Sequence, residues 1–230
     1  MQKGGKSKLC GRYTRPFESD DLEDRFELSN NIGPIEQSYN VSPGEYSYIV
    51  TKNSPKKGVK MKWGYIAPWE KDPSKAKFKP INARNDKLTG GFYKQSFTST
   101  RCLVPAGGYY EWRKLQIEGK PFKQPYYFKL KNEDIFSFGG IYSVHKDAEG
   151  KENYFYAIIT TEPNSLQKPI HDRMPLIIPR EKEDEWLDTD KPKELVKPFD
   201  SELMEVWRVN TWVNSGKEDG PRLIEKLPES

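Results

Sequence analysis

Two cysteines stand in different settings along this 230-residue chain. Cys102 lies between Arg101 and Leu103 in a strand-like stretch, and an internal cysteine is most often a small buried side chain. Cys10 follows a short basic segment, residues 1–9. If that segment were removed or never made, the α-amine of Cys10 would have a pKa of about 8, against about 10.4 for lysine, and much more of it would be neutral at pH 7. We therefore predict a structural Cys102 and consider Cys10 as a nucleophile.

The amine and the thiol of an N-terminal cysteine can act in turn on one aldehyde. The amine condenses with the carbonyl carbon to an imine, and the thiol then adds to the imine carbon and closes a five-membered thiazolidine ring. An imine formed by lysine hydrolyses readily, whereas the thiazolidine should persist. An exposed Cys10 amine would therefore suit the covalent capture of an aldehyde, and an acylated one would not.

Glu111 and His171 each leave two interpretations open. Glu111 stands between Tyr110 and Trp112, so its carboxylate lies either on the solvent face of a strand or in an apolar pocket that raises its pKa. In the second case it could act as a general acid or base. His171 precedes Asp172 and is either a hydrogen-bonded structural residue or an acid–base catalyst.

Asn82 and Arg84 follow a loop rich in lysine and proline, residues 71–80. A surface loop is the ordinary explanation of such a segment. The planar guanidinium of an arginine also suits two-point binding of phosphate oxygens, so Arg84 is a candidate anion-binding residue. His145 follows a strand and precedes a turn, which predicts a surface position.

The composition sets limits on the class of protein. Aromatic residues make up 13%, which argues against disorder, and the formal charge of +4 is compatible with nucleic acid or with an ordinary basic enzyme. Two cysteines cannot form a disulfide framework, and the chain has no long apolar run, so we expect a cytoplasmic protein that no membrane segment anchors. The two histidines do not lie in a ligand-spaced cluster with cysteine, and we predict neither a metal nor a cofactor.

Strand-like segments dominate and do not alternate regularly with long helices, which predicts a single-domain α+β fold with a curved, largely antiparallel, barrel-like sheet flanked by short helices. Helices are predicted over 20–28 and 180–187, with a short one near residue 194. The pattern pairs 126–131 with 135–143 as a hairpin. The predicted strands are 46–51, 59–64, 100–105, 108–112, 126–131, 135–143, 154–161, 174–178 and 206–209.

Four segments resemble the SRAP family, the SOS-response-associated peptidases or abasic-site-processing proteins. Their members use a cysteine exposed by removal of the initiator methionine to crosslink themselves to abasic DNA, whose C1′ carries a latent aldehyde. The resemblance spans almost the whole chain and implies the same fold class. The segments are Cys10-Gly11-Arg12, Ile81-Asn82-Ala83-Arg84, Tyr110-Glu111-Trp112 and Ile170-His171-Asp172-Arg173-Met174-Pro175.

The resemblance implies four catalytic residues. Cys10 would be the nucleophile, and Asn82 would lie beside it and orient the opened sugar. Glu111 would be the general acid and base near the cysteine amine. His171 would protonate the sugar O4′ and favour the open aldehyde.

The resemblance also implies a surface for single-stranded DNA, which needs cations along the backbone and flat apolar groups beneath the bases. Arg12, Arg84 and Arg173 would bind phosphates. Pro43 and Trp69 match positions that wedge against the bases beside the lesion; otherwise they are a packed proline turn and a core tryptophan. The family often has two adjacent tryptophans at this point, where this chain has one.

Residues 1–9 would block the amine of Cys10, and we therefore treat residues 10–230 as the SRAP-like domain. The leader is either a propeptide cut at the Leu9–Cys10 bond, a start-site error, or a remnant of cloning. We favour the start-site error, because Lys3-Gly4-Gly5-Lys6 can be encoded by a ribosome-binding sequence and Leu9 by the start codon TTG.

The leading interpretation is a monomeric abasic-site sensor that crosslinks to single-stranded DNA containing abasic sites, with some lyase activity through the imine. It would be cytoplasmic and associate with the nucleoid when acting on DNA. One alternative is a cysteine peptidase that uses Cys10, His171 and Glu111. The other is a module that binds single-stranded DNA without a covalent bond.

Overall fold

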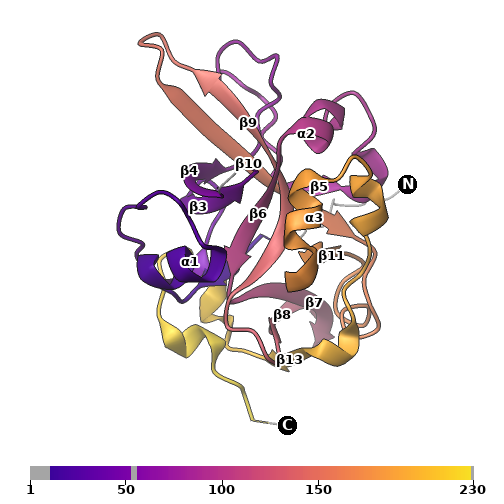
Figure 1. Ribbon diagram of the computed structural model, residues 1–230. Helices are drawn as coiled ribbons and strands as arrows, with labels where there is room; N and C mark the ends of the chain where they lie inside the picture. Colours follow the sequence, from indigo (N-terminus) through magenta and orange to yellow (C-terminus); the bar gives the residue numbers. More distant parts are fainter. Residues whose placement is uncertain (1–10, 53–55, 229–230) are drawn as a thin grey trace, which may run out of the picture.

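The computed structural model describes residues 11–52 and 56–228, and Cys10 therefore lies outside the described residues. Two sheets build the fold (Figure 1). The first is antiparallel and has the strand order β13-β8-β7-β1-β2. Its strands are β1 (Tyr13–Arg15), β2 (Ser38–Val41), β7 (Gly108–Ile117), β8 (Lys120–Leu130) and β13 (Met204–Arg208).

The second sheet closes on itself. β10 pairs with both β4 and β9, and the pairings β4–β3, β3–β6 and β6–β9 complete a ring of five strands. Closure of a ring leaves no strand edge exposed along it. The strands are β3 (Tyr46–Thr51), β4 (Lys57–Trp63), β5 (Asn82–Arg84), β6 (Arg101–Ala106), β9 (Phe136–Lys146), β10 (Glu152–Thr161), β11 (Met174–Pro175) and β12 (Ile177–Ile178).

Aromatic rings fill the interior of the ring of strands. The rings of Trp63 and Tyr156 stack in parallel with their centroids 6.2 Å apart, and Tyr13 meets Trp63 edge-on at 5.2 Å. The first six residues of β9 are all buried, as expected of a strand covered on both faces. Beyond them burial alternates, and the β9–β10 hairpin projects from the body of the molecule (Figure 1).

Short helices cover the outside of the sheets. In α1 (Ser19–Phe26) the apolar side chains of Leu22 and Phe26 lie four residues apart and are buried, and Glu18 and Asp21 form a capping box at its start. The other α-helices are α2 (Lys94–Ser99) and α3 (Glu183–Asp188). The 3₁₀ turns are η1 (Asn85–Lys87), η2 (Arg180–Lys182), η3 (Pro192–Leu195), η4 (Ser201–Leu203), η5 (Thr211–Asn214) and η6 (Pro221–Ile224).

The fold confirms the predicted α+β class and the largely antiparallel, barrel-like sheet, with β10–β4 and β10–β5 as its parallel pairs. The hairpin predicted between 126–131 and 135–143 is wrong. β8 pairs with β7 and β13, whereas β9 pairs with strands of the other sheet. The real hairpin turns at Glu118 and Gly119, which both have positive φ, the combination that suits a tight two-residue hairpin turn. The single strand predicted over 174–178 is also divided, because β11 pairs with β10 and β12 with β9.

Within the two described stretches, no helix is long and apolar enough to span a membrane.

Candidate functional site

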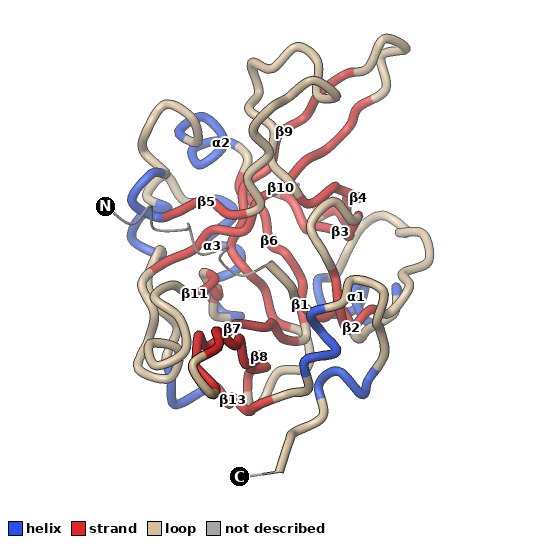
Figure 2. Tube along the Cα trace, turned by 180° about the vertical axis from the view of Figure 1, so that it is seen from behind, coloured by secondary structure: helices blue, strands red, loops and turns tan. Residues whose placement is uncertain are grey.

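The C-terminal end of β10 brings two of the predicted segments together. β5 runs parallel to β10, with Asn82 opposite Ile158 and Arg84 opposite Thr160. β11 pairs with the same end of β10, and the segment 171–173 leads directly into it. Figure 2 shows β5, β10 and β11 gathered above β7 and β8. Residues about ninety positions apart in sequence thus meet at one end of the sheet.

Arg173 is held inside this end of the sheet. Its guanidinium is 8% exposed and donates to Glu162 Oε1 at 3.1 Å, Asn85 Oδ1 at 2.7 Å and the carbonyl of Thr160 at 2.6 Å. Such a buried cation, paired with a carboxylate and carbonyls, fixes the segments that it joins. The geometry therefore favours a role in positioning β10, η1 and the 171–173 segment over direct contact with a phosphate, and the predicted phosphate contact stays a prediction.

Arg84, in contrast, lies on the surface. Its Nε donates to Asp86 Oδ1 at 3.0 Å, and this hydrogen bond raises the pKa of Arg84, helped by the charges of Asp172 and Glu162. An exposed ion pair of this kind contributes little free energy, so a phosphate can compete for the guanidinium. β5 and β11 meet at the same end of β10, so Arg84 lies at the end of the sheet that also carries the His171 segment.

His171 is 8% exposed, and its environment favours the neutral imidazole. Burial lowers the pKa of His171, the charge of Asp172 opposes this, and the cations Lys114 and Arg173 add to the lowering. Nδ1 lies 3.2 Å from the backbone N–H of Arg173 and also 3.2 Å from Asp172 Oδ1. Only the first contact is a hydrogen bond when Nδ1 carries no proton. Because the Asp172 side chain is 84% exposed and water screens its charge, we assign the neutral form with the proton on Nε2.

Glu111 is 1% exposed, so the solvent-facing interpretation is wrong and its burial is confirmed. Tyr109 lies two residues earlier in β7 and therefore on the same face. The Tyr109 hydroxyl donates to Gln167 Oε1 at 2.9 Å, and the carbonyl of Gln167 accepts from the N–H of His171 at 3.0 Å. The side-chain amide of Gln167 donates to the carbonyl of Arg173 at 3.0 Å. The face of β7 that carries Glu111 thus packs against the segment that carries His171.

The start of the described chain lies beside β7. β1 runs antiparallel to β7, and the carbonyl of Arg12 accepts from the N–H of Tyr110 at 3.1 Å. Moving back along β1 therefore means moving forward along β7, from Tyr110 towards Glu111. Cys10 itself lies outside the described residues, and its place in the site stays a prediction.

Arg12 lies beside β2, and Pro43 lies in the turn that follows this strand. Arg12 Nη1 donates to Asn40 Oδ1 at 2.8 Å, and burial lowers the pKa of Arg12 while the charge of Glu45 opposes that effect. Pro43 is exposed in the turn between β2 and β3. The turn also leads to Tyr46, which is 49% exposed. This end of the sheet therefore offers a half-buried cation and exposed apolar side chains.

Trp69 is exposed rather than part of the core, with 57% of its surface accessible. Its ring meets Phe92 edge-on at 5.7 Å, and Phe78, which is 62% exposed, lies 5.3 Å from the same ring. These three rings, with Lys75 and Lys77, line a cavity of about 320 Å³. We call the three rings the aromatic platform. Phe78 and Phe92 were not predicted; an aromatic residue in a lysine-rich loop was the available signal.

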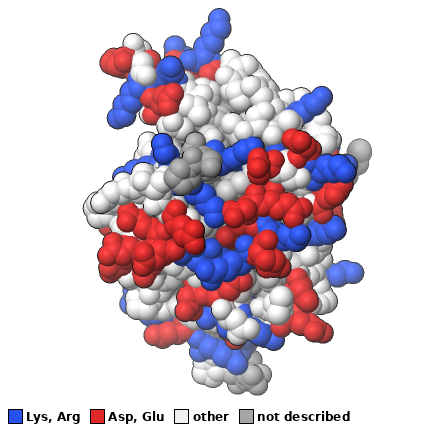
Figure 3. All heavy atoms as spheres, viewed as in Figure 1, with Lys and Arg blue, Asp and Glu red and all other residues white. Residues whose placement is uncertain are grey.

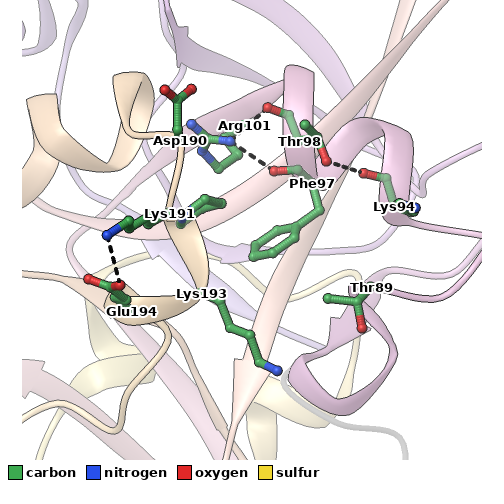
Figure 4. Close-up of a pocket in the computed structure, with 10 residues that line it drawn as sticks. Thr89, Lys94, Phe97, Thr98, Arg101, Asp190, Lys191, Lys193 and Glu194 are labelled. Atoms are coloured by element: carbon green, nitrogen blue, oxygen red, sulfur yellow. Dashed lines mark hydrogen bonds and ion pairs between the residues drawn. The ribbon is translucent and has the colours of Figure 1, made fainter.

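A larger cavity, of about 510 Å³, lies between α2 and η3 (Figure 4). None of the predicted site residues lines it. Its wall includes Arg101, whose guanidinium donates to carbonyls near the C-terminal ends of α2 and α3, among them Phe97 at 2.9 Å and Trp186 at 2.7 Å. A cation at two helix C-termini stabilises both helices, so we interpret Arg101 as a structural residue.

The surface seen in Figure 3 is not uniformly basic. Acidic side chains gather over α1, and acidic and basic side chains alternate over the neighbouring surface. Among the described residues, no three His, Cys, Asp or Glu side chains are grouped so as to hold a metal ion.

Comparison with known sequences identifies the family. A sequence model of the family described as SOS response associated peptidase (SRAP) matches residues 9–216. The chain belongs to the SRAP family. It is 38% identical to the abasic site processing protein YoqW of Bacillus subtilis over 226 residues, which cover 94% of this chain and 99% of that protein. It is 30% identical to the abasic site processing protein HMCES of Xenopus tropicalis, over 96% of this chain and 72% of that protein.

Comparison with solved structures gives the same fold. A crystal structure of a protein from Bacteroides thetaiotaomicron is similar with a TM-score of 0.83 and 28% sequence identity. The likeness covers 95% of this chain and 100% of that one. The two chains thus have the same fold, although little more than a quarter of their residues are identical.

Proposed function

We propose that this SRAP protein is an abasic-site sensor that binds single-stranded DNA and captures the lesion as a thiazolidine on Cys10. The observation that carries the proposal is the meeting of three elements: the buried Glu111 on β7, the His171 segment packed on the same face, and β1, which pairs with β7 and follows Cys10 in the sequence. The names of the relatives, abasic site processing proteins, support abasic DNA as the substrate.

In the proposed first step, the neutral amine of Cys10 adds to C1′ of the open sugar, and the resulting carbinolamine loses water to give an imine. The amine must lose protons and the departing water must gain one. A buried carboxyl group such as Glu111 can move these protons between the two atoms. In the second step the thiol adds across the C=N bond: sulfur bonds to carbon and nitrogen takes the proton. No oxidant or other reactant is needed.

His171 acts earlier in this scheme. In the tautomer assigned above, Nδ1 accepts from the backbone N–H of Arg173 and Nε2 carries the proton. We propose that Nε2–H donates to the sugar O4′ and favours ring opening, while Asn82, on the neighbouring β5, orients the opened sugar. The same imine permits β-elimination, and we propose a weak lyase activity from it.

The DNA backbone would pass Arg84 and the lysines near the aromatic platform. Exposed aromatic rings stack on bases without regard to sequence, and cations beside them follow the phosphates. Trp69 and Pro43 would flank the lesion, and Arg12 would bind a phosphate. We therefore expect binding that depends strongly on salt and weakly on base sequence.

One experiment separates this proposal from its two rivals. The protein is incubated with single-stranded DNA that carries an abasic site made by uracil glycosylase, with an unrelated peptide present. A band shift that survives denaturation supports the crosslinker. Loss of the peptide supports a cysteine peptidase built on Cys10, His171 and Glu111, and salt-sensitive retention alone supports a non-covalent binder.

The leader gives a second test of the proposal. We expect protein that retains residues 1–9 to form no adduct, and protein whose initiator methionine directly precedes Cys10 to crosslink once that methionine is removed. Mass analysis of protein from the natural gene with codon 1 destroyed distinguishes the origins of the leader. A product that begins at Cys10 indicates initiation at codon 9, and loss of all product indicates a propeptide. Efficient crosslinking by a verified form with Met1 would overturn the role of the α-amine.

A further inference from the structure

Tyr46 and Lys62 lie side by side on the outer face of the ring of strands. They are direct partners in the antiparallel pair of β3 and β4. Their neighbours Ser47 and Trp63 point into the ring, where the Ser47 hydroxyl lies 2.6 Å from the Tyr13 hydroxyl and the Trp63 indole packs against the Tyr13 ring. Side chains alternate along a strand, so Tyr46 and Lys62 point outward. Tyr46 is 49% exposed, which is unusual for an aromatic side chain in a strand of this ring.

Two ammonium groups lie close to the Tyr46 ring. Lys62 Nζ is 5.7 Å from the ring centroid, and Lys60 Nζ, from two residues earlier in β4, is 5.9 Å from it. A cation at this distance is attracted by the electron-rich face of the ring. Over residues 11–52 and 56–228, neither lysine forms an ion pair with a carboxylate. Both charges are therefore available to an anion that approaches the exposed ring.

The lysines at the opposite end of the same two strands differ. Lys52 follows β3 and Lys56 precedes β4, and both are paired with acidic side chains near α3. Lys56 Nζ lies 2.7 Å from Asp184 Oδ1, and Lys52 pairs with Asp188. The positive charge is thus compensated at one end of the β3–β4 pair and uncompensated at the end that carries Tyr46.

The backbone holds Tyr46 in place. Arg15 Nη1 donates to the carbonyl of Tyr46 at 2.9 Å, and the N–H of Trp63 donates to the carbonyl of Glu45 at 2.9 Å. Glu45 is the acidic neighbour of Tyr46, and its Oε1 accepts from the N–H of Ser42 at 2.9 Å within the turn between β2 and β3. A ring presented by a fixed backbone loses little conformational entropy when a ligand stacks on it.

A row of side chains leads from Tyr46 to the aromatic platform. Phe155 of β10 is the direct partner of Lys62 and is half-buried on the same outer face. The Phe155 ring meets the imidazole of His145 edge-on at 5.6 Å, and the nitrogens of His145 lie 3.1 and 3.3 Å from carbonyls of the 66–70 loop. His145 is 6% exposed because this loop covers it, so its predicted surface position is wrong. The same loop carries the tryptophan of the aromatic platform.

We propose that Tyr46, Lys60 and Lys62 form a second stacking site for single-stranded DNA, the tyrosine–lysine site. One base stacks on the Tyr46 ring, and the two ammonium groups bind phosphates beside that base. The proposal rests on the single-strand binding of the proposed function and extends it. A strand that stacks on the aromatic platform would continue past Phe155 to Tyr46, so the binding site is longer than the lesion and its two flanking bases.

The first test measures stacking on the full-length protein, with no covalent step. Fluorescence anisotropy gives Kd for an undamaged single-stranded oligonucleotide of about 20 nucleotides, longer than the roughly 4–16 nucleotides that one single-strand groove covers. We expect Tyr46→Ala to raise Kd about fivefold or more, the loss of one base–aromatic stack. Tyr46→Phe keeps the ring face and should bind within about twofold of the wild type.

The second test measures the phosphate contacts of the two lysines. In single strands each phosphate contact contributes about 0.7 to the slope of log K against log salt concentration, so Lys60→Gln/Lys62→Gln should reduce that slope by about 1.4. The matched control is Lys52→Gln/Lys56→Gln, which removes the same charge from the opposite end of the same strands. Because carboxylates already pair with those two lysines, the control should leave the slope unchanged.

The outcomes separate this site from the proposed function. Wild-type protein that does not retain single-stranded DNA would remove the DNA-binding part of the proposed function, and the tyrosine–lysine site with it. Retention by the wild type with an unchanged Kd in Tyr46→Ala would overturn the tyrosine–lysine site alone. An equal loss of slope in Lys52→Gln/Lys56→Gln would also overturn it, since the effect would then reflect net charge.

A third measurement needs no variant. The wild type is irradiated with single-stranded oligonucleotides that carry 5-bromouracil at one position each, and the crosslinked peptides are identified by mass analysis. We expect a peptide containing Tyr46 in addition to one containing Trp69. Crosslinks confined to the aromatic platform at every position of the bromouracil would contradict the proposal.

Discussion

His145 and His171 are almost equally buried, with 6% and 8% of their surfaces exposed, yet different groups face their ring nitrogens. Both nitrogens of His145 face carbonyl oxygens, which need N–H donors. Nδ1 of His171 accepts a backbone N–H, and burial lowers the pKa of His171 with the help of Lys114 and Arg173. Burial alone therefore does not define the role of a histidine, because the donors and acceptors around each nitrogen decide which hydrogen bonds the ring makes.

The two histidines also belong to two regions with different tasks. His171 lies with Glu111 in the region proposed for covalent chemistry, and His145 lies behind the aromatic platform proposed for base stacking. If this division holds, changes in the first region should alter the rate of crosslinking and leave binding intact, and changes in the second should do the reverse.

The largest effect is expected from Cys10→Ser, which should abolish the denaturation-resistant adduct and leave salt-dependent binding of undamaged DNA unchanged. A hydroxyl closes the ring poorly, so any imine stays reversible. Gel shifts with and without denaturation measure both properties. Cys102→Ala is the matched control, because Cys102 is fully buried and burial raises the pKa of its thiol, which leaves it unreactive. An undiminished adduct with Cys10→Ser would remove the proposed mechanism.

The next largest effect is expected from Glu111→Gln. An amide keeps the size of the carboxyl group but cannot carry protons between the amine and the leaving water, and general acid–base catalysis contributes about 10²–10⁴-fold. We expect the crosslinking rate at saturating DNA to fall about 100-fold with Kd for undamaged DNA unchanged. Single-turnover kinetics measure the rate. A loss confined to Kd would place Glu111 in the binding region and break the division.

The burial of Glu111 also shows how much of the site the sequence could predict. The local alternation of β7 left the carboxylate on either face, since the segment that buries it lies more than fifty residues further along the chain. The resemblance to the family resolved what the pattern could not. The same limit applies to 126–131 and 135–143, which were predicted correctly as strands but paired wrongly. The true turn between β7 and β8 was missed because Glu118 is an uncommon residue for a turn with positive φ.

The elements predicted best are those whose formation depends on residues close together in the sequence. The helix predicted over 20–28 appears as α1 because Leu22 and Phe26 share one face and acidic residues occupy its first turn. The aromatic platform could not be predicted, since Phe92 reaches Trp69 and Phe78 only after the chain has passed through β5 and η1. His145 was misjudged for the same reason, as its partners belong to a loop about eighty residues earlier.

A smaller effect is expected from Trp69→Ala, in the other region. Stacking of one base on an aromatic ring is worth about 1–3 kcal/mol, and Phe78 and Phe92 remain in place, so we expect Kd for undamaged single strands to rise about tenfold. The crosslinking rate at saturating abasic DNA should not change. Phe97→Leu, in the wall of the larger cavity, is a control for an aromatic residue remote from the platform. An equal rise in Kd with Phe97→Leu would show that the effect is not specific to the platform.

The smallest effect concerns stability, and it tests the neutral state of His171 directly. Because burial lowers the pKa of His171 in the folded protein, the unfolded chain binds its proton more readily. Above about pH 6.5, the ordinary pKa of histidine, the residue is neutral in both states and adds no pH dependence. As the pH falls below that value, the unfolded state gains the proton first, and the free energy of unfolding decreases until the folded pKa is passed. We expect this decrease to be shallower in His171→Gln than in the wild type when urea unfolding is measured at several pH values. A wild type that instead becomes more stable through this residue on acidification would mean that His171 is held as a cation. The neutral state assigned to His171 would then be wrong, and Nε2–H of a neutral ring could no longer be the proposed donor to the sugar.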